Sequence, residues 1–202
     1  FPQHKNVGKR SVYGKRALVT AGPTVEVIDP VRYVSNRSSG KMGYAIAEAL
    51  RDKGAIVTLI SGPTHLSLPE GINVVKVESA DDMFQAVTER FAKQDIVIKA
   101  AAVSDYTPMD ILEHKLKKQE GGLSVQFKRT KDILKYLGEN KTHQYLVGFA
   151  AETQNIEQYA LDKLKRKNAD VIISNNVGDT SIGFSSDDNE LTMHFKNNEK
   201  VN

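Results

Sequence analysis

Cysteine is absent from this chain of 202 residues. Disulfides, thiolate metal sites and a cysteine nucleophile are therefore excluded. Long hydrophobic runs are missing as well, because no stretch approaches the roughly 20 apolar residues that a helix needs to cross a bilayer. We therefore expect no membrane partner and a cytoplasmic location, since a reducing compartment makes disulfide staples unnecessary.

Several catalytic signatures are also missing. The five histidines form no i,i+4 pair and have no glutamate at metal-binding spacing, so a zinc enzyme is not indicated. The sequence has no Gly-x-Ser-x-Gly elbow, no Gly-x-x-x-x-Gly-Lys-Ser/Thr loop and no Gly-x-Gly-x-x-Gly fingerprint. A surplus of lysine with few nucleophiles favours electrostatic catalysis on phosphates.

Positive charge is concentrated at the start of the chain. The net charge is +3, and residues 1–16 contribute +5 because they hold five basic residues and no acid, so the remainder carries −2. These residues lack apolar periodicity and are interpreted as a basic leader or linker before a single domain at residues 17–202. Because the body is close to neutral, we predict no nucleic-acid partner.

Apolar and amphipathic segments alternate along the domain. Apolar runs predict strands at residues 16–20, 56–60, 74–77, 95–98, 145–149, 170–174 and 191–195, with a small hairpin strand at 123–127. Helical spacing predicts helices at residues 42–53, 81–93, 131–137 and 155–168, and residues 24–41 are predicted to be a long polar loop. This pattern indicates an α/β fold, a Rossmann-like doubly wound, mostly parallel sheet with a small β-hairpin or flap extension. Ligands of such sheets bind beyond the carboxyl ends of the strands.

The segment before the first predicted helix has the composition of an anion site. Residues 36–43 read Asn-Arg-Ser-Ser-Gly-Lys-Met-Gly, so backbone amides at the helix start can converge with the side chains of Ser38, Ser39 and Lys41 on a phosphate. Alternatively, serine and glycine only cap and pack the start of the helix.

The turn upstream of this segment carries two further candidate groups. The sequence Asp-Pro-Val-Arg at residues 29–32 presents the guanidinium of Arg32, and the amide of Asn36 can donate to a developing oxyanion. The alternative is a surface pair between Arg32 and Asp29 with a turn-forming asparagine.

Two more strand ends carry candidate residues. Small residues follow the strand at 95–98 and precede Asp105, and their small side chains let a ligand approach the backbone. The alternative is that this alanine run serves the packing of a helix against the sheet. The strand at 145–149 ends in Phe149, on which a base could stack.

Lysines cluster in two places. The sequence Lys-Leu-Lys-Lys at residues 115–118 suggests a mobile basic flap over a polyanion, and Lys163 and Lys167 share one helix face. For each cluster, the alternative is that the lysines only form a solvated part of the protein surface.

Taken in order, these segments resemble the phosphopantothenoylcysteine synthetase family, in particular its bacterial CTP-dependent type. The resemblance runs from residue 17 to about residue 195 through Thr-Ala-Gly-Pro-Thr, Asp-Pro-Val-Arg-Tyr-Val-Ser-Asn, Ser-Ser-Gly-Lys-Met-Gly, Ala-Ala-Val-Ser-Asp-Tyr, Lys-Leu-Lys-Lys, Gly-Phe-Ala-Ala-Glu-Thr and Gly-Phe-Ser-Ser-Asp-Asp-Asn.

The resemblance implies a ligase of coenzyme A biosynthesis that joins 4′-phosphopantothenate to L-cysteine. The substrate carboxylate would attack the α-phosphate of CTP with release of pyrophosphate, and the cysteine amine would then displace CMP from the acyl-cytidylate. Mg²⁺ would accompany CTP, with its protein ligands unassigned. The implied chemistry agrees with the residues, because a carboxylate meeting a triphosphate needs positive charge and alignment rather than a nucleophile.

The resemblance also implies roles for individual residues. Asn36 and Lys115 are implied to be catalytic, and Arg32, Asn36 and Ala101 to bind substrate. The implied nucleotide contacts are Ser38, Ser39, Gly40, Lys41, Asp105, Lys115, Asp132, Ile133, Phe149, Lys163 and Lys167.

The sequence departs from the family pattern in two places. Thr-Lys-Asp-Ile stands at residues 130–133 where the family has Asn-Pro-Asp-Ile, and Val25 stands where many members have arginine. Members continue past the last strand into a C-terminal helix, so we expect a truncated chain. Many bacterial members are fused behind a flavin-dependent decarboxylase, and we expect no flavin in this chain. A homodimer is a further expectation from the family.

Two other functions fit the same fold class. One is a nucleotide-binding regulatory module without turnover, and the other is an NADPH-binding reductase. The sequence does not reveal whether CTP is preferred over ATP, because recognition of the base often depends on backbone groups.

Overall fold

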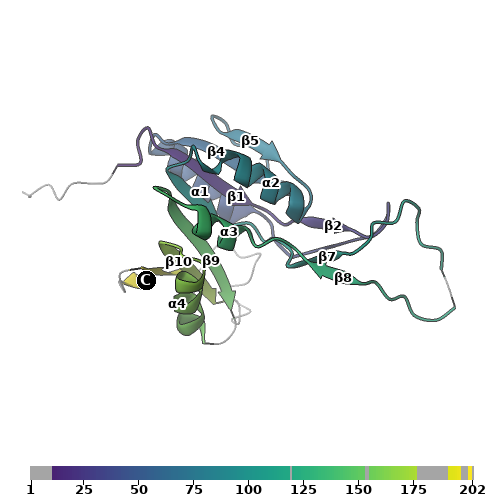
Figure 1. Ribbon diagram of the computed structural model, residues 1–202. Helices are drawn as coiled ribbons and strands as arrows, with labels where there is room; N and C mark the ends of the chain where they lie inside the picture. Colours follow the sequence, from purple (N-terminus) through teal and green to yellow (C-terminus); the bar gives the residue numbers. More distant parts are fainter. Residues whose placement is uncertain (1–10, 119, 153–154, 177–190, 197–199, 202) are drawn as a thin grey trace, which may run out of the picture.

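One mixed sheet forms the centre of the molecule (Figure 1). The computed structural model describes residues 11–118, 120–152, 155–176, 191–196 and 200–201. The strands of the sheet are β1 (Arg16–Ala21), β4 (Ile56–Ser61), β5 (Asn73–Lys76), β6 (Ile96–Lys99), β9 (Tyr145–Glu152), β10 (Val171–Asn176), β11 (Leu191–Phe195) and β12 (Lys200–Val201).

The order of these strands is that of a doubly wound fold. It runs β12-β11-β10-β9-β6-β1-β4-β5, and the pairs from β10 to β5 are parallel while β11 and β12 are antiparallel additions. Chain order proceeds outward from β1 in one direction and restarts with β6 in the other. The carboxyl ends of β1 and β6 therefore flank the switch point where such sheets bind ligands. The predicted fold class is confirmed.

Helices cover both faces of the sheet. They are α1 (Lys41–Asp52), α2 (Ala80–Phe91), α3 (Ile133–Asn140) and α4 (Ile156–Arg166). Successive residues of β1 point to opposite faces, so Leu18 packs in the core beneath α2, α3 and α4, while Ala17 and Val19 pack in the core beneath α1. Among the described residues, no helix is long and apolar enough to span a membrane.

Local signals in the sequence explain where the helices begin. Ser79 and Asp82 form a reciprocal capping box at the start of α2, and Asp132 accepts a hydrogen bond from the backbone N–H of Lys135 at the start of α3. α1 begins after Gly40, whose left-handed φ of 79° favours glycine.

Two hairpins extend from the carboxyl edge of the sheet as an arm (Figure 1). They consist of β2 (Val25–Val27) with β3 (Tyr33–Ser35), and of β7 (Tyr106–Pro108) with β8 (Phe127–Arg129). The predicted hairpin extension is confirmed, but its position at residues 123–127 is wrong, because pairing with β7 begins only at Phe127.

The prediction of one long loop at residues 24–41 is also wrong, since that segment contains β2 and β3. Strands of three residues contain too few alternations to stand out from a polar segment. Helix ends differ from the predicted bounds by up to three residues, as for α3, which was expected at residues 131–137.

A buried carboxylate holds the two hairpins of the arm together. Asp29 is 1% exposed and accepts hydrogen bonds from the backbone N–H groups of Val31, Arg32 and Leu116, at 2.8, 2.8 and 3.1 Å. Arg32 Nη1 lies 2.6 Å from Asp29 Oδ2 and also donates to the carbonyl of Leu116. Burial alone would raise the pKa of Asp29, but these hydrogen bonds outweigh it and lower the pKa to about 2.

A first prediction concerns the contact of α1 with the sheet. A Cβ atom on Gly43 would lie 2.4 Å from the Cβ of Ala21. We expect Gly43→Ala to lower the free energy of unfolding by about 1–3 kcal/mol through overpacking, despite the better helix propensity of alanine. Urea unfolding measures this change, with Gly122→Ala as control because nothing lies within 4 Å of its added Cβ. A Gly43→Ala protein as stable as the parent would contradict this packing.

A second prediction concerns the acid sensitivity of the arm. Because the folded pKa of Asp29 lies below its ordinary value of 3.8, its stabilising contribution is present above about pH 4 and is lost as the pH falls toward 2. We expect the stability difference between the parent and Asp29→Asn to shrink between pH 5 and pH 3 in urea unfolding. The exposed Asp110→Asn serves as control. A difference that does not change with pH would show that the carboxylate is not held as described.

Candidate active site

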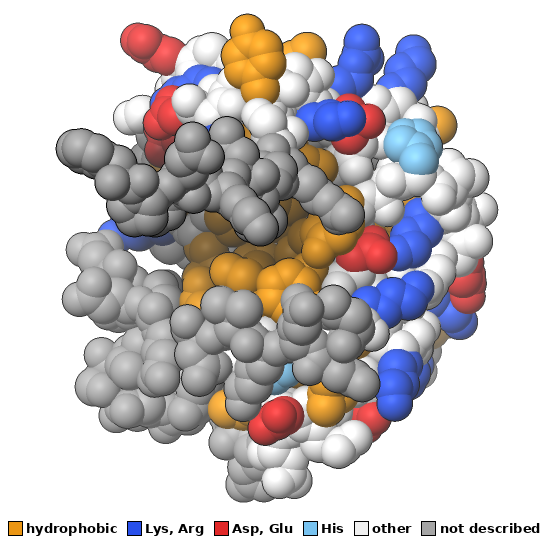
Figure 2. Space-filling view, turned by 90° about the vertical axis from the view of Figure 1, so that its left-hand side faces the viewer, with side chains coloured by type: hydrophobic (Ala, Val, Ile, Leu, Met, Phe, Trp, Pro, Cys, Tyr) orange, Lys and Arg blue, Asp and Glu red, His pale blue; other side chains and the backbone are white. Residues whose placement is uncertain are grey.

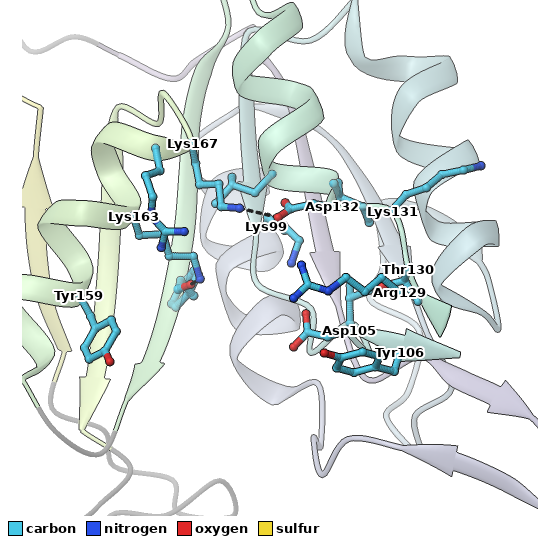
Figure 3. Close-up of a pocket in the computed structure, with 15 residues that line it drawn as sticks. Lys99, Asp105, Tyr106, Arg129, Thr130, Lys131, Asp132, Tyr159, Lys163 and Lys167 are labelled. Atoms are coloured by element: carbon cyan, nitrogen blue, oxygen red, sulfur yellow. Dashed lines mark hydrogen bonds and ion pairs between the residues drawn. The ribbon is translucent and has the colours of Figure 1, made fainter. Parts of the chain in front are cut away.

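A basic cavity lies at the carboxyl ends of β6 and β9, next to the switch point (Figure 3). Its volume is about 490 Å³, which lies within the range of small-molecule sites. Six basic side chains line it against two acidic ones; they are Lys99, Arg129, Lys131, Lys163, Arg166 and Lys167, with Asp105 and Asp132. On the face shown in Figure 2, by contrast, acidic and basic side chains are interspersed around a central group of hydrophobic side chains.

Three segments bring these residues together. The loop after β6 supplies Asp105, the N-cap of α3 is Asp132, and the C-terminal part of α4 supplies Lys163, with Lys167 as the C-cap of that helix. Thr130 fixes the first two segments to each other, because its hydroxyl donates to the carbonyl of Ser104 at 2.7 Å and its N–H donates to the carbonyl of Asp105 at 3.0 Å.

The two predicted lysines of α4 are anchored differently. Lys163 Nζ donates to the carbonyl of Phe149 at 2.7 Å, and Lys167 Nζ forms an ion pair with Asp132. Burial alone would raise the pKa of Asp132, but the hydrogen bonds from Lys167 and Lys135 and the charge of Lys99 lower it. The structure brings five of the predicted nucleotide contacts together around this cavity: Asp132, Ile133, Phe149, Lys163 and Lys167.

The contact of Phe149 with Lys163 is made by the backbone carbonyl. Leu146 and Ala150 of β9 belong to the core beneath α3 and α4, so alternation places the Phe149 ring on the other face of the sheet. Its carbonyl oxygen is the group that contacts Lys163.

The loop at residues 100–105 separates this cavity from a second group of predicted residues. Ala101 is buried, and its N–H donates to Thr20 Oγ1 at 3.2 Å. Asn36 lies on the other side of the loop, where its Nδ2 donates to the carbonyls of Ala102 at 3.4 Å and Val103 at 3.2 Å. Val103 itself lines the cavity, so Asn36 stands next to it without lining it.

The predicted anion-binding segment surrounds the start of α1. Ser38 Oγ accepts from the N–H of Gly40 at 3.3 Å, and Ser39 Oγ accepts from the N–H of Lys41 at 3.4 Å. Both contacts are local, spanning two residues, and among the residues that the structure describes no side chain caps the start of α1. None of the four predicted residues of this segment lines the cavity; they are Ser38, Ser39, Gly40 and Lys41. They lie at the end of β1, on the other side of the switch point from the cavity.

Lys115 stands on the arm. It is exposed and does not line the cavity, but the next residue, Leu116, is tied to Asp29 and Arg32. The residue that follows Lys115 therefore lies at Arg32, whereas Lys163 lines the cavity. The predicted motif at residues 183–189 lies outside the described residues.

Several residues that line the cavity were not predicted from the sequence. Lys99 ends a strand, where a lysine is usually solvated, and Arg129 lies on a hairpin that was placed elsewhere. Tyr159 and Arg166 lie on α4, four residues before and three residues after Lys163, and this helical spacing was a usable signal.

Lys99 is the most perturbed cation of the cavity. Burial lowers its pKa to about 8, the positive charges of Lys163 and Lys167 add to the shift, and the carboxylates of Asp132 and Asp105 oppose it. A group of ammonium ions held this closely favours a polyanionic ligand.

The acidic side chains of the cavity also indicate how a divalent cation could bind. Among the described residues there is no group of three or more histidine, cysteine or acidic side chains that could hold a metal on its own. Asp105 is the cavity carboxylate that makes no ion pair in the described part of the chain. This fits a cation that arrives on phosphate oxygens and needs one protein carboxylate, as Mg²⁺ commonly does.

Known proteins match this chain over nearly its whole length. The chain is 54% identical over 188 residues to the coenzyme A biosynthesis bifunctional protein CoaBC of Bacillus subtilis, covering 93% of this chain and 46% of that protein. The chain therefore spans about half the length of the curated relatives that it matches.

Solved structures agree with this match. The C-terminal domain of a CoaBC protein is 47% identical, with a TM-score of 0.81 over 96% of this chain and 87% of that one. A DNA/pantothenate metabolism flavoprotein from Streptococcus pneumoniae is 26% identical, with a TM-score of 0.79 over 93% of this chain and 92% of that one.

The family model described as "DNA/pantothenate metabolism flavoprotein C-terminal domain" matches residues 12–202. Because this match covers nearly the whole chain, the chain belongs to the family of DNA/pantothenate metabolism flavoprotein C-terminal domains.

Proposed function

We propose that this chain is a ligase of coenzyme A biosynthesis that joins 4′-phosphopantothenate to L-cysteine with CTP. The observation that carries the proposal is the cavity beside the switch point, which six basic residues line against two acidic ones, although Lys131 pairs with Asp81. Such an excess suits a nucleoside triphosphate, because bringing a substrate carboxylate against it requires neutralised charge. The relation to CoaBC proteins, which are named for coenzyme A biosynthesis, supports the same choice.

The first step would occur between the cavity and the arm. The substrate carboxylate attacks the α-phosphorus of CTP, and the bond from that phosphorus to the bridging oxygen of the pyrophosphate breaks. Lys163 and Lys167 are placed to hold phosphate oxygens, and Arg32, whose side chain is 39% exposed, to orient the second anion. Lys115 would add a positive charge as the negative charge of the transition state builds up. Mg²⁺, held by the phosphates and Asp105, would neutralise charge on the triphosphate.

The second step would use Asn36. The cysteine amine attacks the acyl carbon, CMP leaves and the amine loses a proton. The hydrogen bonds from Asn36 Nδ2 to the carbonyls of Ala102 and Val103 are long, at 3.4 and 3.2 Å, so an oxyanion on the acyl group can replace them. Asn36 is therefore assigned the stabilisation of that oxyanion.

Recognition of the base is assigned to the backbone. The ring of Phe149 belongs to the opposite face of β9, whereas its peptide group lies at the cavity. Peptide groups can distinguish cytosine from adenine through their donor and acceptor pattern, and for this reason the sequence did not show the preference for CTP.

We propose further that the chain works as a homodimer joined through the arm, in a protein that also carries a flavin-dependent decarboxylase. The arm exposes apolar side chains that a partner would cover, among them Val31, Tyr33, Ile111 and Leu123, each at least 60% exposed. The relatives, twice as long as this chain, support the fusion.

A third prediction tests the ligase assignment. With 4′-phosphopantothenate, cysteine and Mg²⁺, we expect CTP to yield CMP and pyrophosphate at a higher rate than ATP yields AMP. Lys115→Gln should slow pyrophosphate release by about 100-fold or more, since it removes a charge that acts in the transition state. Lys117→Gln is the matched control, because it removes another exposed lysine of the same segment.

Two results would contradict the assignment. Nucleotide binding without CMP or AMP would indicate the regulatory module, and stabilisation by NADPH alone would indicate the reductase. Unchanged pyrophosphate release by Lys115→Gln would remove the proposed role of that residue.

A fourth prediction separates the two steps. Asn36→Asp replaces a donor by a negative charge, so we expect aminolysis of the acyl-cytidylate to slow by about 100-fold while pyrophosphate release slows less. Rapid-quench measurement of intermediate formation and decay gives both rates. Equal loss in both steps would argue against the oxyanion role.

A further inference from the structure

We propose that Lys99 binds a phosphate group of the nucleotide and that its amine takes up a proton from solvent when the nucleotide binds. This inference rests on the proposed function, because it assumes that the cavity receives a nucleoside triphosphate. It adds a phosphate ligand that lies outside the predicted set, and it makes binding depend on pH.

The position of Lys99 supports this role. It is the last residue of β6, the strand that borders the switch point on the side of the cavity. Strand alternation puts Lys99 on the same face as Val97, which belongs to the core beneath α2, α3 and α4. Figure 3 shows its side chain extending into the cavity between Asp132 and Arg129.

Lys99 differs from the other lysines of the cavity in what it contacts. Lys163 donates to the carbonyl of Phe149, Lys167 pairs with Asp132, and Lys131 turns away to Asp81 at 2.7 Å and the ring of Phe84. Within the described part of the chain, Lys99 makes neither a hydrogen bond nor an ion pair. A partly buried ammonium group without a partner is unfavourable, and a phosphate oxygen would supply that partner.

The charged groups around Lys99 come from every element that packs there. Asp105 follows β6, Arg129 ends β8, Asp132 precedes α3, and Lys163 and Lys167 lie on α4. The pKa of Lys99 is lowered to about 8 by burial first and by Lys163 and Lys167 second, against the two carboxylates. Lys99 therefore loses part of its charge above pH 8 when no anion is bound.

A bound phosphate would reverse this shift. Its negative charge stabilises the ammonium form and raises the pKa, so binding at pH 8 should take up about half a proton at this site. As the pH rises above 8, a larger fraction of the unliganded protein has a neutral Lys99, so binding must take up a larger fraction of a proton from solvent. The affinity for the nucleotide should then fall, by up to tenfold per pH unit, until the pKa of the bound state is reached.

The test compares Lys99→Met and Lys99→Arg with the parent chain. Isothermal titration with CTP at pH 7.0 should show about 10- to 100-fold weaker binding to Lys99→Met, since a charged hydrogen bond is lost. Lys99→Arg should bind well and should lose less affinity than the parent between pH 7.5 and 9.5, because arginine stays charged. Titrations at pH 8 in buffers of different ionisation enthalpy should show more proton uptake by the parent than by Lys99→Arg.

The matched control is Lys93→Met. Lys93 is exposed and precedes β6, so it lies at the opposite edge of the sheet, and its loss should leave CTP affinity unchanged. Urea unfolding of Lys99→Met establishes that the variant is folded before its affinity is interpreted.

The outcomes separate this inference from the proposed function. Equal affinity of Lys99→Met and the parent for CTP, or equal proton uptake by Lys99→Arg and the parent, would overturn the role of Lys99 and leave the ligase standing. Failure of the parent to bind either CTP or ATP would overturn the proposed function, and the inference with it.

Discussion

Mutual repulsion among ammonium groups at one edge of the sheet is the constraint on which the rest of the structure depends. Lys99, Lys163 and Lys167 lie around one cavity with only two carboxylates beside them. Keeping such charges together costs free energy, and the lowered pKa of Lys99 reflects its burial first and this repulsion second. Two hydrophobic cores, one on each face of the sheet, hold the strand ends and helices in place and so maintain this unfavourable arrangement until an anion arrives.

The site consists of two parts that a single loop joins. The cavity lies between β6, α3 and α4, and the arm carries Arg32 and Lys115. Residues 100–105 connect them, since Asn36 binds the carbonyls of this loop from one side and Asp105 faces the cavity on the other. In the proposed reaction the nucleotide occupies the first part and the acid the second, so the reacting atoms meet at the loop. Asp29 then positions Lys115 indirectly, through the hydrogen bond to Leu116.

Much of the fold was predictable because buried parallel strands and amphipathic helices leave long, regular signals. The strand at β6 and the helix at α4 are examples. The arm was less predictable, because β2 and β3 have three residues each and their pairing is set by Asp29 and Arg32 rather than by apolar alternation. The resemblance to the family named five of the residues that line the cavity between positions 132 and 167, namely Asp132, Ile133, Phe149, Lys163 and Lys167. Lys99 was missed because its significance comes from burial and neighbours, which a strand-ending lysine does not reveal in sequence.

The central claim is that the basic cavity holds the triphosphate. A crystal structure of the 202-residue chain with CTP and Mg²⁺, without the acid substrate, tests it most directly. We expect phosphate oxygens within hydrogen-bond distance of Lys163 Nζ and Lys99 Nζ, with the base toward the peptide group of Phe149. Phosphates bound elsewhere, with the cavity filled by solvent, would contradict the claim.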